Sequence, residues 1–142
     1  MTPAHRVVFL DDEPAILRAL LRVFREESFE VLPTADPRQA LEWLREGDVS
    51  VLLVDYRLPG MSGTTLLEHA RQLSPATARI LLTGFAGEGP VLAGRKAGLF
   101  TVFAKPWDDR ELLRTVREQL RDRELEGERR RWPRGIRNQR KA

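Results

Sequence analysis

Five short apolar runs alternate with five amphipathic helical segments along this chain, and that alternation constrains the fold more than any other feature of the sequence. The runs that we expect to form strands are Arg6–Leu10, Phe29–Leu32, Val51–Val54, Arg79–Leu82 and Leu99–Ala104. Near-continuous apolar runs joined by helices are typical of parallel strands that are buried on both faces. The sequence therefore predicts an α/β fold, a doubly wound five-stranded parallel sheet with helices on both faces and strand order 2-1-3-4-5.

Local signals mark where the helices begin. Pro14 suits the first turn of a helix, and Asp36 and Asp108 each suit the N-cap of the helix that follows. The third helix is expected over Thr64–Leu73. The fourth, over Glu88–Ala97, is crowded by glycines, and each interior glycine costs roughly 1 kcal/mol relative to alanine. We therefore expect the fourth helix to be short.

Composition and charge divide the chain into one domain and a tail. Residues 1–122 carry 16 Lys/Arg against 18 Asp/Glu, whereas residues 123–142 carry 8 against 3. We expect a folded domain over 1–122 and a basic, disordered tail over 123–142. The chain has no cysteine and no apolar stretch near the roughly 20 residues that cross a bilayer, which excludes thiol chemistry and a membrane span. No signal peptide is evident, so the expected location is the cytoplasm.

Polar residues follow four of the expected strands at their carboxyl ends. Asp11 and Asp12 follow the first strand, Asp55 the third, Thr83 the fourth and Lys105 the fifth. In an open parallel sheet these ends share one edge, and ligands bind there. Three carboxylates at one edge would repel one another unless a divalent cation lay between them, and oxygen ligands suit Mg²⁺. With a lysine and a hydroxyl beside the carboxylates, the set predicts Mg²⁺-assisted phosphoryl transfer to a carboxylate.

Four motifs that contain these residues give the chain a resemblance to a known family. The motifs are FLDDEP over Phe9–Pro14, LLVDYRLPGMSG over Leu52–Gly63, ILLTG over Ile80–Gly84 and AKPW over Ala104–Trp107. In this order and at these strand ends, they resemble the receiver domain of bacterial response regulators, over roughly Arg6–Arg121. The resemblance implies a flavodoxin-like fold, that of the chemotaxis response regulator, and a role in two-component signal transduction.

The resemblance also implies a role for each matching residue. Asp55 would be the phosphoacceptor. Lys105 would pair with one phosphoryl oxygen, and Thr83 would donate its hydroxyl to another. The Lys105–Pro106 peptide bond would be cis, as is usual in the family. The groups that would hold Mg²⁺ are Asp11, Asp12, Asp55 and the backbone carbonyl of Arg57.

One position departs from the family pattern, and another bears on the lifetime of the phosphoryl group. Receivers usually have Tyr or Phe three positions before the lysine, where this chain has Val102. We expect Phe100 and Phe103 to point to the opposite face, since side chains alternate along a strand. Signalling then runs without the usual aromatic toggle, or a register shift lets a phenylalanine substitute. Phe85, two residues after Thr83, is expected to shield a phosphoryl group from water.

The resemblance implies partners as well as chemistry. A sensor histidine kinase would donate the phosphoryl group, and an output protein or domain would bind the face formed by the fourth helix, fifth strand and fifth helix, where homodimers also form in the family. No enzymatic turnover is expected beyond self-phosphorylation and slow dephosphorylation. One alternative is an aspartyl-phosphate phosphatase, which typically has an aspartate where this chain has Arg57. A second alternative is a phosphorylation-independent scaffold with the receiver fold. A third is a nucleic-acid or membrane contact through the basic tail, although a solvated tail is the simpler interpretation of its charge.

Overall fold

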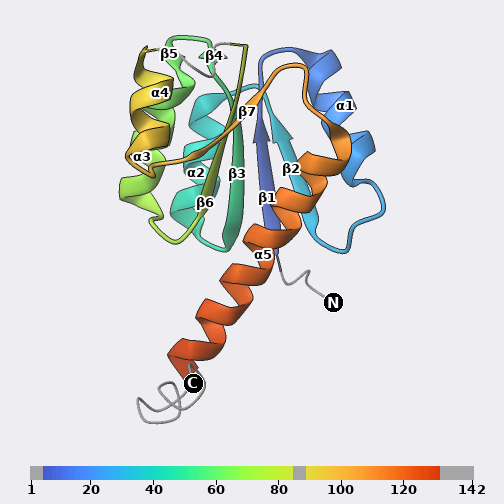
Figure 1. Cartoon of the computed structure of the whole chain (residues 1–142), viewed down its shortest axis with the longest axis vertical. Coiled ribbons are helices and arrows are strands. Elements are labelled where there is room, and N and C mark those ends of the chain that lie inside the picture. The colour runs from blue at the N-terminus through green and yellow to red at the C-terminus, as the bar shows by residue number, and fades with distance from the viewer. Residues whose placement is uncertain (1–4, 85–88, 132–142) are drawn as a thin grey trace.

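The computed structural model describes residues 5–84 and 89–131, and side chains as far as Arg123 (Figure 1). The strands are β1 (Arg6–Leu10), β2 (Glu30–Thr34), β3 (Val49–Asp55), β4 (Arg57–Leu58), β5 (Met61–Ser62), β6 (Ala78–Thr83) and β7 (Thr101–Ala104). The helices are α1 (Pro14–Phe24), α2 (Pro37–Glu46), α3 (Gly63–Leu73), α4 (Gly89–Lys96) and α5 (Asp109–Arg131). Strands and helices thus alternate along the chain, as the sequence predicted.

Five strands form one parallel sheet in the order β2-β1-β3-β6-β7. With the two-residue strands β4 and β5 set aside, this is the predicted order 2-1-3-4-5, and the flavodoxin-like fold is confirmed. The strands β4 and β5 pair with each other in an antiparallel hairpin, where only a turn was expected. All five long strands run the same way, so their carboxyl ends lie together at the upper edge of the sheet in Figure 1.

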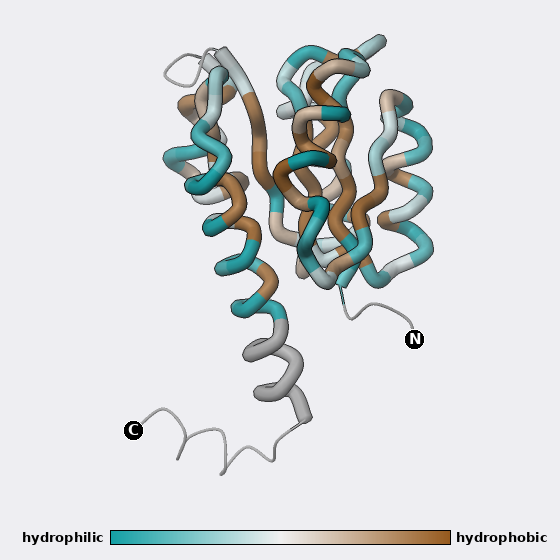
Figure 2. Tube along the Cα trace, turned by 90° about the vertical axis from the view of Figure 1, so that its right-hand side faces the viewer, coloured by the Kyte–Doolittle hydropathy of each residue, from teal (hydrophilic) through white to brown (hydrophobic). Residues whose placement is uncertain are grey.

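Helices cover both faces of the sheet, each over its own apolar layer. Helices α1 and α5 pack on one face through a cluster that includes Phe9, Leu20 and Val116. Helices α2, α3 and α4 pack on the other face through a cluster that includes Leu52 and Leu67. Figure 2 shows the strands as hydrophobic segments between helices of mixed character. Because every central strand is buried on both sides, the strands are apolar throughout rather than alternating.

Several element bounds differ from those expected. β2 begins one residue later, at Glu30, and continues through Pro33 to Thr34. β7 begins only at Thr101, because Leu99 is part of the turn that ends α4. Helix α5 continues to Arg131, beyond the boundary expected at Asp122. The expectation of a disordered tail stays a prediction for residues 132–142, which lie outside the described residues. Among the helices of the described part, none is long and apolar enough to cross a membrane.

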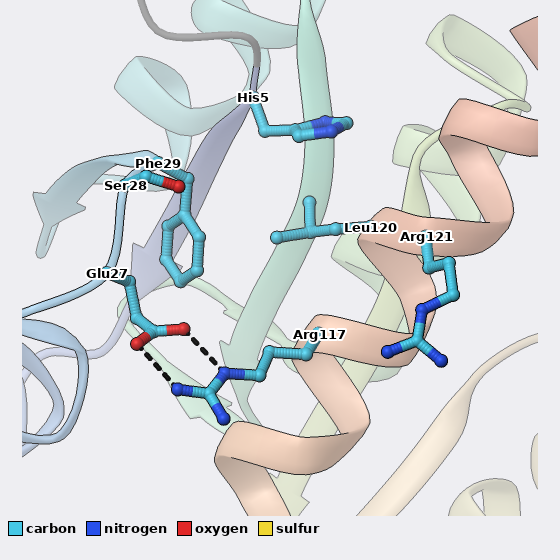
Figure 3. A pocket seen from close by; sticks show the side chains of 7 residues that line it. All are labelled: His5, Glu27, Ser28, Phe29, Arg117, Leu120 and Arg121. Atoms are coloured by element: carbon cyan, nitrogen blue, oxygen red, sulfur yellow. Dashed lines mark hydrogen bonds and ion pairs between the residues drawn. The ribbon is translucent and has the colours of Figure 1, made fainter.

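An ion pair fastens α5 to the connection between α1 and β2. Arg117 donates from Nε and Nη2 to the two carboxylate oxygens of Glu27, at 2.7 and 2.8 Å (Figure 3). The pair borders a cleft of about 210 Å³ whose lining includes Phe29 and Leu120. Because His5, which precedes β1, also lines this cleft, it lies at the amino-terminal edge of the sheet, opposite the edge where the acidic residues gather.

Candidate functional site

The three predicted aspartates meet at the carboxyl edge of the sheet. Asp11 and Asp12 follow β1, and Asp55 is the last residue of the adjacent strand β3. One carboxylate oxygen from each residue lies within 4.8 Å of the others. Asp11 and Asp55 are 1% and 5% exposed, whereas Asp12 faces solvent. The site therefore places two buried carboxylates and one exposed carboxylate within reach of a single cation.

Lys105 lies between the two buried carboxylates. Its Nζ donates a hydrogen bond to Oδ1 of Asp55 and lies 3.6 Å from Oδ2 of Asp11. Burial opposes the charge of the ammonium group, but the hydrogen bond to Asp55 and the two carboxylate charges outweigh it, so the pKa of Lys105 is raised. The backbone N–H of Lys105 donates to the carbonyl of Thr83 at 2.8 Å, and the Lys105–Pro106 peptide bond is cis, as the resemblance implied.

Asp11 has one satisfied and one unsatisfied oxygen. Its Oδ1 accepts a 2.9 Å hydrogen bond from the backbone N–H of Glu13. Its Oδ2 is buried without a hydrogen-bond partner. Burial raises the pKa of Asp11 from 3.8 to about 6; the hydrogen bond from Glu13 opposes this, and the nearby charge of Asp55 adds to it. A buried carboxylate oxygen that lacks a partner, in an all-oxygen set, fits a hard cation such as Mg²⁺.

The backbone around Asp55 is held by a close approach of α3. The Asp55 Oδ2 accepts from the backbone N–H of Arg57 at 3.2 Å, and the Gly63 N–H donates to the Tyr56 carbonyl at 2.6 Å. A Cβ at Gly63 would collide with the Asp55 carbonyl oxygen and with Cα of Tyr56. Gly63 therefore lets the first residue of α3 contact the backbone at the end of β3. Gly60, with φ of +78°, is the residue that the turn requires.

Thr83 completes the group of predicted side chains at this edge. It ends β6, is 1% exposed and lines a cleft of about 260 Å³ at this edge of the sheet. The residues that line the cleft are Asp12, Glu13, Asp55, Tyr56, Arg57, Thr83, Gly84 and Lys105. All five predicted side chains therefore gather at one edge, with Asp11 buried just beneath the cleft. Sequence reasoning did not find that Tyr56 lines it too.

The aromatic residues near Val102 are not arranged as expected. Phe103 packs on the α1 and α5 face of the sheet, which agrees with the prediction. Phe100, in contrast, packs on the α4 face together with Val102. The expectation that both phenylalanines oppose Val102 was wrong for Phe100, because residues two apart along an extended chain point the same way. Phe85, which was expected to shield the phosphoryl group, lies outside the described residues.

Comparisons with known proteins agree with this geometry. A family profile described as "Response regulator receiver domain" matches residues 7–117. The hydrogenase transcriptional regulatory protein HoxA of Cupriavidus necator is 34% identical over 123 residues, which cover 86% of this chain and 25% of HoxA. Sporulation initiation phosphotransferase F of Bacillus subtilis is 26% identical over 116 residues, 82% of this chain and 94% of that protein. The chain thus spans about a quarter of the length of HoxA.

Solved structures show the same fold. The signal receiver domain of an HD domain-containing protein from Pseudomonas fluorescens Pf-5 superimposes with a TM-score of 0.81 and 32% sequence identity. The superposition covers 91% of this chain and 96% of that structure. The similarity in fold therefore extends over nearly the whole of both chains.

Proposed function

This chain belongs to the family of response regulator receiver domains, and on that basis we propose that Asp55 accepts a phosphoryl group from a sensor histidine kinase with the help of Mg²⁺. One observation carries the proposal. Two buried carboxylates and an exposed one converge at the carboxyl edge of the sheet, and Lys105 bridges the buried pair. Such a set holds a cation and a transferable anion together, which is what phosphoryl transfer to a carboxylate requires.

The groups present suit the separate parts of the transfer. A carboxylate oxygen of Asp55 would attack phosphorus, while the bond from phosphorus to the donor nitrogen breaks and its electron pair stays on the imidazole. Lys105, now bonded to Asp55, would follow the negative charge to a phosphoryl oxygen, since an ammonium is a mobile point charge on a flexible stem. The Thr83 hydroxyl would donate to a second phosphoryl oxygen.

Mg²⁺ would be held by Asp11, Asp12, Asp55 and the backbone carbonyl of Arg57. When bound, it would neutralise charge on the phosphoryl oxygens and so reduce their repulsion from the carboxylates. The buried Oδ2 of Asp11 supports this assignment, because it lacks a hydrogen-bond partner and a bound cation would supply a direct ligand contact. Asp12, exposed at the rim, would be the ligand that an entering hydrated ion meets first.

Phosphorylation would act on a partner through the α4, β7 and α5 face. Thr83 ends β6, Lys105 directly follows the neighbouring strand β7, and a backbone hydrogen bond joins the two residues. A phosphoryl group that draws both side chains toward Asp55 would therefore displace the ends of both strands together. We propose that an output domain, an output protein or a second copy of the chain binds this face in the phosphorylated state.

The test is phosphorylation by a small acyl-phosphate donor, measured by intact-mass spectrometry. The wild-type chain is expected to gain one phosphoryl group in Mg²⁺ and none in EDTA, and Asp55→Asn is expected to gain none under either condition. Asp36→Asn is the control, since Asp36 caps α2 away from the site and its loss leaves the adduct unchanged. Failure of the wild-type chain to be modified, or modification of Asp55→Asn, would overturn the proposal.

A further inference from the structure

The ring of Phe100 occupies the space that a side chain at Gly94 would need. Gly94 is one of two buried residues of α4, the other being Val91. A Cβ built on Gly94 would overlap Cε2 and Cζ of Phe100. Phe100 in turn packs against the apolar cluster on the α4 face, beside Val102. The helix backbone thus rests directly on the aromatic ring, a contact that we call the Gly94–Phe100 notch.

The carboxyl end of α4, next to the notch, is firmly held. Gly98, with φ of +73°, donates to the Arg95 carbonyl at 3.1 Å, and Leu99 donates to the Gly94 carbonyl at 2.9 Å. These two bonds form the glycine-terminated cap that commonly ends helices. The Leu99 carbonyl then accepts from Nε of Arg79 at 2.9 Å, which ties the cap to β6. The end of α4 that carries the notch is therefore fixed to the sheet.

The amino end of α4 is connected to the candidate site. α4 begins at Gly89, and Thr83 ends β6, so five residues separate them along the chain. Apart from Val91 and Gly94, the residues of α4 from Pro90 to Lys96 are exposed or partly exposed, so little buried surface restrains the helix between its two ends. Thr83 pairs with Ala104 of β7, and β7 begins at Thr101, directly after Phe100, so a displacement of Thr83 would be passed along β7 to the ring beneath α4.

We infer that the Gly94–Phe100 notch is the contact through which phosphorylation changes the position of α4. It would take the part of the aromatic residue that receivers usually have where this chain has Val102. This inference rests on the proposed phosphorylation of Asp55. Val102 is too small to fill or vacate a ring-sized site, whereas the Phe100 ring both contacts α4 and is anchored to the sheet. Loss of the ring would leave Asp55 chemistry intact and uncouple α4 from it.

The test compares hydrogen exchange of the α4 amides with and without beryllofluoride and Mg²⁺, which together mimic the phosphoryl group. In the wild-type chain the exchange of α4 is expected to change on addition of the mimic. In Phe100→Ala this difference is expected to be lost, although acyl phosphate still adds one phosphoryl group by intact mass. Phe103→Ala is the matched control, because it removes the same ring from the opposite face of β7 and should keep the α4 response.

A second pair of variants guards against simple loss of folding. The methyl group of Gly94→Ala would overlap the Phe100 ring, so this variant should displace α4 even without the mimic. Gly94→Ala with Phe100→Ala makes room for that methyl group, and should return basal α4 exchange toward the wild-type value without restoring the response. An α4 response that persists in Phe100→Ala, or is lost equally in Phe103→Ala, overturns the inference. If the wild-type chain takes up the phosphoryl group without any change in α4 exchange, the inference is overturned but the proposed function is not. If no phosphoryl adduct forms, both the inference and the proposed function are refuted.

Discussion

Replacement of Asp11 by Asn is expected to stabilise the metal-free domain at neutral pH. The buried Asp11 carboxyl has a pKa raised from 3.8 to about 6, chiefly by burial. Its ionised form is therefore less favourable in the folded chain than in the unfolded chain. This rise in pKa lowers the free energy of unfolding by about 3 kcal/mol when the group is ionised in both states, since each pKa unit corresponds to about 1.4 kcal/mol. Asn resembles the protonated carboxyl in shape and carries no charge, so Asp11→Asn removes that cost.

The sign of the effect defines its pH window. Between pH 3.8 and about 6 the folded chain binds more protons than the unfolded chain at this residue. The stability that protonated Asp11 contributes is therefore fully present below pH 3.8 and is lost as pH rises through about 6. The advantage of Asp11→Asn should accordingly be close to its full value at pH 7.5 and vanish near pH 4.

Urea unfolding followed by circular dichroism, in chelator and at pH 4, 5.5 and 7.5, measures this prediction. Asp12→Asn is the control, because Asp12 is exposed and its removal should change the free energy of unfolding little. Added Mg²⁺ should reverse the order at pH 7.5, since it stabilises the wild-type chain more than Asp11→Asn. If Asp11→Asn is less stable than wild type in chelator at pH 7.5, or its advantage does not shrink in acid, the electrostatic reasoning is wrong.

Three further substitutions follow from individual contacts. Gly63→Ala should lower the free energy of unfolding by about 1–3 kcal/mol in urea titrations, because its Cβ overlaps the Asp55 carbonyl; Gly84→Ala, in open space, should not. Lys105→Ala should tighten Mg²⁺ binding about tenfold by calorimetry while slowing phosphorylation, because it removes a competing cation; weaker binding would contradict this. Thr77→Val should lower the free energy of unfolding by about 1–2 kcal/mol, since it breaks a buried 2.7 Å hydrogen bond to the Val49 carbonyl. Thr77→Ser keeps the hydroxyl and should retain most of that stability.

The sheet and the acidic edge could be predicted because they depend on long, simple patterns. A run such as Val51–Val54 is apolar at every position, which is typical of a strand buried on both faces. Once the strands are parallel, the residues that follow them must share an edge. Asp11 and Asp55, 44 residues apart in sequence, therefore meet without any need to know the packing between them.

The features that sequence reasoning missed depend on tertiary contacts or on very short segments. The continuation of β2 through Pro33 is possible because β2 is an edge strand, where a missing N–H costs no sheet hydrogen bond. The two-residue strands β4 and β5 are too short to carry any periodicity. The role of Gly63 is set by the backbone of Asp55 across the sheet edge, and a sequence shows only that the residue is small.

The placement of Phe100 shows a different limit. Its position two residues before Val102 indicates the same face, but only the cap at the end of α4 explains why the ring lies beneath Gly94. Helix α5 similarly continues past Asp122 although apolar periodicity stops near Leu120, since Arg and Glu have a high intrinsic helix propensity. Pattern therefore predicted which layers form, while the positions at which elements end were decided by local hydrogen bonds.

The most direct measurement of the central claim is the identity of the phosphorylated residue. Borohydride reduces an aspartyl phosphate to homoserine, so peptide mass spectrometry after phosphorylation and reduction shows which aspartate was modified. Homoserine at position 55, formed in Mg²⁺ and absent in EDTA, is the expected result. Homoserine at position 11 or 12, or an acyl phosphate that forms equally well without a divalent cation, would contradict the account.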